Sequence, residues 1–216
     1  LTIDSMDIQN GSVTYSEKLK ENKPPGILSL SDLNLGVSHL SNTYESLMKT
    51  TIKVHGTFMK NSPLRATWNF DVNKTNDAFH FEGYLGSLMT SNMNVFLTPL
   101  LNVELKGEVA ETYFEINGDG NQSTINMAQD YEDINVNILN KKNKKLKILS
   151  GIANIFINDD STHEGKTLHN VTATATRDHT KSFFNYLARN LKASLIIMYT
   201  KKEKANKKKV KNKKRK

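Results

Sequence analysis

The chain has 216 residues, 37% of them hydrophobic, which is enough for one generous domain or two small ones. It carries 30 Lys and Arg residues against 22 Asp and Glu residues, a formal net charge of +8. Residues 201–216 hold ten Lys, one Arg and one Glu and contribute +10, so residues 1–200 have a net charge of −2. The basic charge therefore belongs to a C-terminal segment, which argues against a basic nucleic-acid-binding body.

The absence of Cys from the sequence excludes disulfides, thiolate metal sites and a Cys nucleophile. No apolar run approaches the roughly 20 residues of a membrane-spanning helix, and no signal peptide is recognisable. The chain opens without Met on an alternating segment, residues 1–8. We interpret it as the C-terminal part of a larger protein in which any anchor or signal lies upstream.

Alternation of apolar and polar residues with period two runs from residue 1 to about residue 140. The clearest run is 64–73, and the runs 79–82, 103–109 and 134–138 repeat it, as does 52–58 with a slip around His55-Gly56. Turn residues separate the runs at Asn10-Gly11, at 24–26 and at 117–120. The pattern predicts an antiparallel meander of half-buried strands. The similar segments 52–86 and 103–139 favour an elongated, stacked sheet over a closed barrel.

Three helices are predicted among these strands. Residues 90–101 form a short helix, residues 144–157 carry one apolar stripe, and Thr180 to about Tyr199 is the strongest helix, with Asp178 or Thr180 as its cap. Residues 166–177 return to a strand. Self-repulsion and a lack of apolar residues predict disorder for the last segment. We therefore expect a mainly β domain over residues 1–200 and a disordered Lys-rich tail over residues 201–216.

The sequence contains no recognisable catalytic constellation. The six His residues are scattered, and neither a Gly-rich phosphate loop nor a nucleophile elbow is present. The densest polar cluster, at 159–169, fits a solvated loop better than a metal site, and residues 117–121 fit a hairpin turn better than a calcium loop. We predict no enzyme activity, no catalytic residue, no metal site and no cofactor.

Six segments carry a resemblance to a known family: 8–15 (IQNGSVTY), 68–71 (WNFD), 81–86 (FEGYLG), 94–100 (NVFLTPL), 131–134 (YEDI) and 181–187 (KSFFNYL). In this order and spacing they resemble the C-terminal region of AsmA-type envelope proteins, particularly the Bacteroidetes members with a domain of unknown function. The resemblance implies a bridge-like, repeating β-groove: an elongated, curved antiparallel sheet with an apolar concave face. It also implies a periplasmic protein, anchored in the inner membrane by an upstream helix, that conducts phospholipid toward the outer membrane or regulates envelope assembly. The Lys-rich tail departs from the family pattern.

A sheet with one apolar face needs a cover, and the few predicted helices leave part of that face open to acyl chains. The same alternation also fits a packed core, so both interpretations stand for each residue. The candidate lipid-lining residues are Trp68, Phe70, Val72, Phe79, Phe81, Val103, Leu105, Ile134, Val136 and Ile138.

An apolar helix end followed by a Lys run is the arrangement expected at a membrane interface. The residues predicted to contact an anionic membrane surface are Ile196, Ile197, Tyr199, Lys207, Lys208, Lys209, Lys213, Lys214 and Arg215. The expected partners are phospholipid, that membrane surface and an envelope protein, with no specific nucleic acid. We predict phospholipid binding or conduction along an apolar β-groove; the alternative is a structural or interaction module with a filled core and a docking tail.

Overall fold

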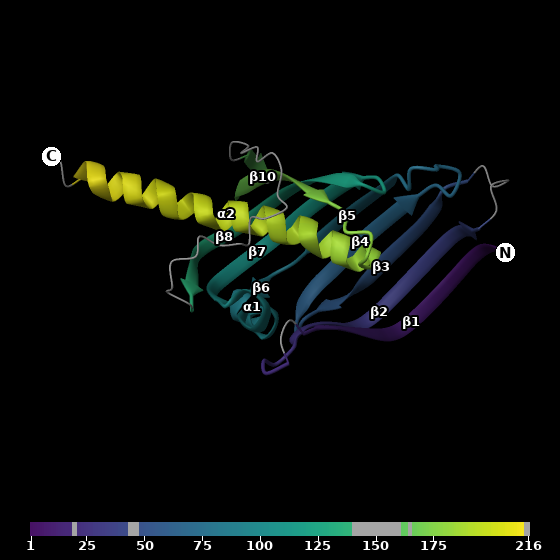
Figure 1. Ribbon diagram of the computed structural model, residues 1–216, viewed down its shortest axis with the longest axis horizontal. Helices are drawn as coiled ribbons and strands as arrows, with labels where there is room; N and C mark the ends of the chain where they lie inside the picture. The colour runs from purple at the N-terminus through teal and green to yellow at the C-terminus, as the bar shows by residue number, and fades with distance from the viewer. Residues whose placement is uncertain (19–20, 43–47, 140–160, 164–165, 214–216) are drawn as a thin grey trace.

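The computed structural model describes residues 1–18, 21–42, 48–139, 161–163 and 166–213. These residues form one antiparallel sheet with two α-helices, and Figure 1 shows α2 lying across the sheet. The strands are β1 (Thr2–Glu17), β2 (Gly26–Ser41), β3 (Thr50–Phe58), β4 (Ser62–Phe70), β5 (Phe79–Leu85), β6 (Leu88–Met89), β7 (Val103–Gly118), β8 (Gln122–Ile138), β9 (Ser161–His163) and β10 (Lys166–Thr176). The helices are η1 (Thr90–Met93), α1 (Asn94–Leu101) and α2 (Phe183–Lys213).

The strands lie side by side almost in the order of the chain. The sheet runs β1-β2-β3-β4-β5-β7-β8-β10-β9, and the short β6 pairs with β7 off this path. Every pairing is antiparallel, because short turns connect most consecutive strands. The prediction of a mainly β fold on a large antiparallel sheet with a C-terminal helix is confirmed.

The period-two alternation divides the sheet into two chemically different faces. In register across β3, β4, β5, β7 and β8 lie Ile52, Trp68, Phe81, Ile116 and Ile125, which define the apolar face. The next row on the opposite side of the same strands is Lys53, Thr67, Glu82, Glu115 and Asn126, which defines the polar face. Because the register is continuous over these strands, each face is a single surface.

Helix α2 packs on the apolar face and closes the core there. Ile116 and Ile125 are completely buried, and Tyr186, Leu187 and Ile197 of α2 belong to the same buried cluster. The helix begins after Ser182, whose Oγ accepts a hydrogen bond from the backbone N–H of Asn185 at 3.3 Å. The predicted cap, Asp178 or Thr180, is therefore wrong; Asp178 instead holds the preceding turn by accepting from Thr180.

The last helix is longer than the sequence indicates. Helix α2 runs to Lys213 and includes most of the segment for which the composition predicts a tail from residue 201. Lys, Ala and Glu are good helix formers, and a helix that is already nucleated by packing extends through them at little cost. In Figure 1 this part of α2 projects past the edge of the sheet. We call residues 199–213 of α2 the basic extension.

Helix α1 confirms the helix predicted at 90–101 and is fastened to the sheet by side chains. The amide of Asn94 donates to the carbonyl of Leu105 at 3.0 Å and accepts from its N–H at 2.8 Å. Phe96 lies against Tyr15 of β1 with ring centroids 6.4 Å apart. The helix thereby joins β7 to the end of β1.

Several local predictions differ from the structure. Asn10-Gly11 is a bulge inside a single 16-residue strand, with Asn10 at φ 55°, and not a turn. Strand β4 ends at Phe70, so Val72 lies in the following turn. The slip expected around His55-Gly56 is absent from β3, which pairs with β4 in regular register. The register shift lies in the neighbouring strand β2, between Ser31 and Asn34.

The second of the two similar segments also differs from its prediction. It consists of two long strands, β7 and β8, whereas the first segment contains the three shorter strands β3, β4 and β5. The helix predicted at 144–157, together with Asp159, Asp160 and Glu164 of the polar cluster, lies outside the described residues.

Candidate functional site

Four of the predicted lipid-lining residues come together beneath the start of α2. Trp68 stacks on Phe183 with ring centroids 4.4 Å apart, and Phe70 lies 4.9 Å from Trp68. Phe79 contacts Phe183 edge-on at 4.9 Å and is buried, while Phe81 stacks on Phe114 at 5.9 Å. These aromatic side chains are thus occupied by one another and by α2.

The other lining candidates are divided between the far end of the sheet and the turn after β4. Val103 and Leu105 are buried near α1, and Ile134 packs against the main core. In the backbone, Val136 pairs with Leu105 and Ile138 with Val103; their side chains are outside the described set. Val72 is half-buried in its turn. The ten candidates therefore do not form one continuous exposed lining.

A buried polar contact fixes the position of α2 on the sheet. Asn190 is completely buried; its Oδ1 accepts from Ser123 Oγ at 2.9 Å, and its Nδ2 donates to the carbonyl of Tyr186 at 2.9 Å. Burial raises the pKa of Tyr186, whose hydroxyl lies in the same interface. Asn190 links the helix to β8 by a bond that an apolar residue could not make.

Part of the apolar face remains exposed on the β1 side. Ile8 and Val13 of β1 are on this face and are 43% and 52% exposed. Near Val13 the strand approaches both helices, because Tyr15 lies against Phe96 of α1 and near the side chain of Asn185 of α2. Phe184, the neighbour of Asn185, is 68% exposed. We call Ile8, Val13 and Phe184 the exposed apolar patch.

The residues predicted to contact a membrane lie mainly on the basic extension. Ile196 and Ile197 precede it. Ile197 is 5% exposed and part of the core, so its side chain is not available to a membrane surface. Ile196 is half-buried. Tyr199, Lys207, Lys208, Lys209 and Lys213 are helical in α2, whereas Lys214 and Arg215 lie outside the described residues. Among the helices of the described chain, none is both long and apolar enough to cross a bilayer.

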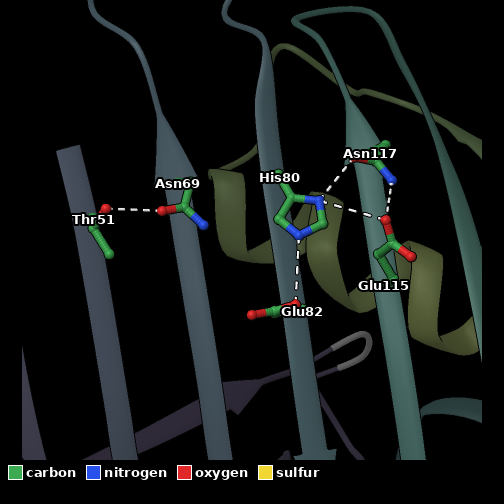
Figure 2. A network of polar contacts seen from close by, with 6 residues as sticks. All are labelled: Thr51, Asn69, His80, Glu82, Glu115 and Asn117. Carbon is green, nitrogen blue, oxygen red and sulfur yellow. Dashed lines mark hydrogen bonds and ion pairs between the residues drawn. The ribbon is translucent and has the colours of Figure 1, made fainter. Parts of the chain in front are cut away.

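The polar face carries a network that sequence reasoning did not identify (Figure 2). His80 Nδ1 lies 2.8 Å from Asn117 Oδ1 and 3.6 Å from Glu115 Oε1, while its Nε2 lies 3.6 Å from Glu82 Oε2. Asn117 Nδ2 donates to Glu115 at 2.7 Å. The imidazole therefore separates two carboxylates that face each other across β5 and β7. Thr51 and Asn69 form a second contact on the same face, at 2.8 Å.

Next to this network the polar face contains an open hollow of about 650 Å³. Its side chains come from six strands, β3, β4, β5, β7, β8 and β10. They are Lys53, His55, Arg65, Thr67, Glu82, Tyr84, Tyr113, Glu115, Asn126, Ala128 and Asn170. Lys53, Arg65, Thr67, Glu115 and Asn126 each stand between two apolar residues of their strand, so alternation alone marks them only as solvent-facing. Which of these residues are neighbours in space depends on the pairing register of six strands, and the sequence alone does not give that register.

In the described part of the chain, no group of three or more His, Cys, Asp or Glu side chains has a geometry that could hold a metal ion. Comparison of the chain with protein-family models, curated proteins and solved structures finds no match.

Proposed function

We propose that this protein is a non-enzymatic lipid-binding module of the cell envelope. Acyl chains would bind on the exposed apolar patch beside α2, and the basic extension would lie at an anionic membrane surface. The observation that carries the proposal is that the apolar face is wider than the helix that covers it, with Ile8 and Val13 left exposed on β1. The resemblance to AsmA-type proteins supports the same class of ligand and the same compartment.

The physical basis is burial of apolar area. Each acyl CH₂ that leaves water for such a surface contributes about 0.8 kcal/mol, and no reacting group is needed. The lipid headgroup stays in water at the edge of the sheet. Lys side chains near an anionic surface contribute about 1 kcal/mol each, which brings the patch to the membrane.

The proposed lipid site occupies only part of the apolar face, so the proposal does not include conduction of lipid along the whole face. Trp68 and Phe79 contact Phe183, so an acyl chain at the centre of the sheet would have to displace α2. Lipid binding is therefore assigned to the β1 side, where no such displacement is needed.

Native mass spectrometry and lipid extraction of the purified protein test the proposal. We expect bound phospholipid, and a loss of at least half of it in the double variant Val13→Asp/Phe184→Asp. Both residues are exposed, so the variant should keep its fold by circular dichroism. The matched control is Thr14→Asp, an exposed residue that points to the other side of β1. Lipid-free wild-type protein, or equal loss in the control, contradicts the proposal.

A structural module with a filled core is the second candidate, and the stacking of Phe183 on Trp68 favours it. In that case α2 closes the core permanently, and the basic extension is the part that docks. Protein that purifies without lipid but still binds anionic vesicles would support this second function.

A further inference from the structure

We propose that the hollow on the polar face binds a saccharide that carries an anionic group. The hollow lies on the side of the sheet opposite to α2 and to the exposed apolar patch, so this site is independent of the proposed lipid binding. Three features of its lining, taken in order across the strands, carry the inference.

The first feature is a cationic end on β3 and β4. Lys53, His55 and Arg65 line the hollow, and Arg65 is the direct cross-strand partner of His55. Among the described residues, no carboxylate forms an ion pair with any of the three. Arg65 is a diagonal cross-strand neighbour of Glu82 but forms no ion pair with it. The carboxylate of Glu82 contacts His80 instead. Two permanent cations beside a hollow leave charge that a carboxylate or phosphate complements.

The second feature is an aromatic centre on β5 and β7. Tyr84 and Tyr113 face each other across the two strands with ring centroids 5.1 Å apart and an angle of 49° between the rings. The hydroxyl of Tyr113 donates to Glu111 at 3.0 Å, which holds this ring in place. Rings that stand on a polar face and line an open hollow offer apolar surface to a ligand with both polar and apolar sides. The C–H face of a sugar ring has this character.

The third feature is an amide end on β8 and β10. Asn126 and Asn170 line the hollow there, and Thr172 holds Asn126 by donating to its Oδ1 at 2.8 Å. Ala128 lies between them in the lining and leaves the space open. Oriented amides bind hydroxyl groups, and adjacent strands are spaced about 4.8 Å apart, close to the width of a sugar ring.

The same lining disfavours a polyanion such as single-stranded nucleic acid. Glu82 and Glu115 also line the hollow, immediately beside the aromatic pair. A chain with a negative charge on every unit would place some of these charges next to the two carboxylates. The charges fit a ligand whose anionic group sits at the Lys53 and Arg65 end and whose hydroxyl groups lie over the remainder.

Titration of the full chain by NMR and calorimetry tests this site. The probes are 3′-sialyllactose, which carries one terminal carboxylate, glucose 6-phosphate, neutral galactotriose and a short oligothymidylate. We expect an acidic saccharide to bind at least tenfold more tightly than galactotriose, with shift changes on β4, β5 and β7. 3′-Sialyllactose as the tighter acidic probe identifies carboxylate as the anionic group, and glucose 6-phosphate identifies phosphate.

Arg65→Gln should weaken the acidic saccharide at least tenfold, and Tyr84→Leu should weaken both saccharide classes. Lys60→Gln, which removes an exposed cation in the turn between β3 and β4, is the matched control and should bind as the wild type does. Equal binding of acidic and neutral probes, no saccharide binding, or tighter binding of oligothymidylate would overturn the proposal. Val13→Asp/Phe184→Asp should leave it unchanged, which separates this site from the lipid proposal.

Discussion

Asn190 shows at the scale of one residue how α2 is held in a single position on the sheet. Apolar contacts between a helix and a sheet tolerate small shifts, whereas the bond from Ser123 to Asn190 requires one alignment. The residue is fully buried, and its amide satisfies two groups, the Ser123 hydroxyl and the Tyr186 carbonyl. A helix pattern read from sequence would treat Asn190 as an interruption of the apolar stripe.

We expect Asn190→Ala to lower the free energy of unfolding by about 1–3 kcal/mol, because it leaves a buried hydroxyl and a buried carbonyl with poorer partners. Urea denaturation followed by circular dichroism measures the loss. Asn185→Ala, at a less buried position of the same helix, is the comparison and should cost less. An equal loss in both variants would contradict the assigned role.

Asp119 gives the turn between β7 and β8 a dependence on pH. Its Oδ1 accepts from the backbone N–H of Asn121 at 2.7 Å and of Gln122 at 2.9 Å. The N–H groups of Gln122 and Asn121 hold the pKa of this carboxyl below its usual range. Because the folded pKa is the lower one, the stabilisation is complete above the ordinary Asp pKa of about 4 and is lost as the pH falls through the folded value.

For Asp119→Ala we therefore expect a loss of about 0.5–1 kcal/mol at pH 7, kept small by solvent screening, and a smaller loss at pH 2. Urea midpoints of the variant and the wild type at the two pH values measure it. A difference that does not shrink on acidification would show that the charge of Asp119 is not responsible.

At the scale of elements, α2 divides into a packed part and the basic extension. Residues 183–198 contact the core, and Lys201 begins a run whose charge exceeds that of the whole chain. A single helix therefore connects the closed core to the site proposed for membrane contact.

Deletion of residues 201–216 should reduce binding to anionic vesicles at least tenfold at low salt. The reason is the loss of a +10 segment from a body of net charge −2. Vesicle co-sedimentation measures it, and the difference should nearly vanish in about 1 M salt, where the Debye length is roughly 3 Å. Unchanged binding would assign the membrane contact elsewhere, and a large loss of thermal stability would show that the extension also supports the fold.

The sequence predicts elements well where a periodic pattern decides them, and poorly where tertiary contacts do. The run from 64 to 70 becomes β4 because its alternation continues the apolar face. Asn10-Gly11 has the composition of a turn, but pairing with β2 on both sides keeps it within one strand as a bulge. The hollow could not be predicted, because Arg65, Tyr84 and Asn126 become neighbours only through the register of separate strands.

At the scale of the whole molecule, the proposed lipid would compete with α2 for the apolar face. The helix covers the aromatic centre of the apolar face, and the proposed acyl site begins where that cover ends. Weakening the helix contact should then enlarge the surface that lipid can reach.

Phe183→Ala tests this competition, because it removes the ring that stacks on Trp68 and meets Phe79. We expect a loss of stability of about 2–4 kcal/mol together with more bound phospholipid per chain, the opposite of the effect expected for Val13→Asp/Phe184→Asp. Lipid extraction and urea denaturation measure the two quantities on the same sample. A loss of stability with unchanged or reduced lipid would contradict the competition.

The order of the strands has a consequence for how the protein is made. Since neighbours in the sheet are mostly neighbours in the chain, each hairpin can join the growing sheet as soon as it leaves the ribosome. The helix that covers Trp68 and Phe79, however, follows all the described strands in the chain and is synthesised after them. Until α2 has been synthesised, a broad aromatic surface stays uncovered, so a ribosome-stalled chain that lacks α2 should be a strong client of chaperones.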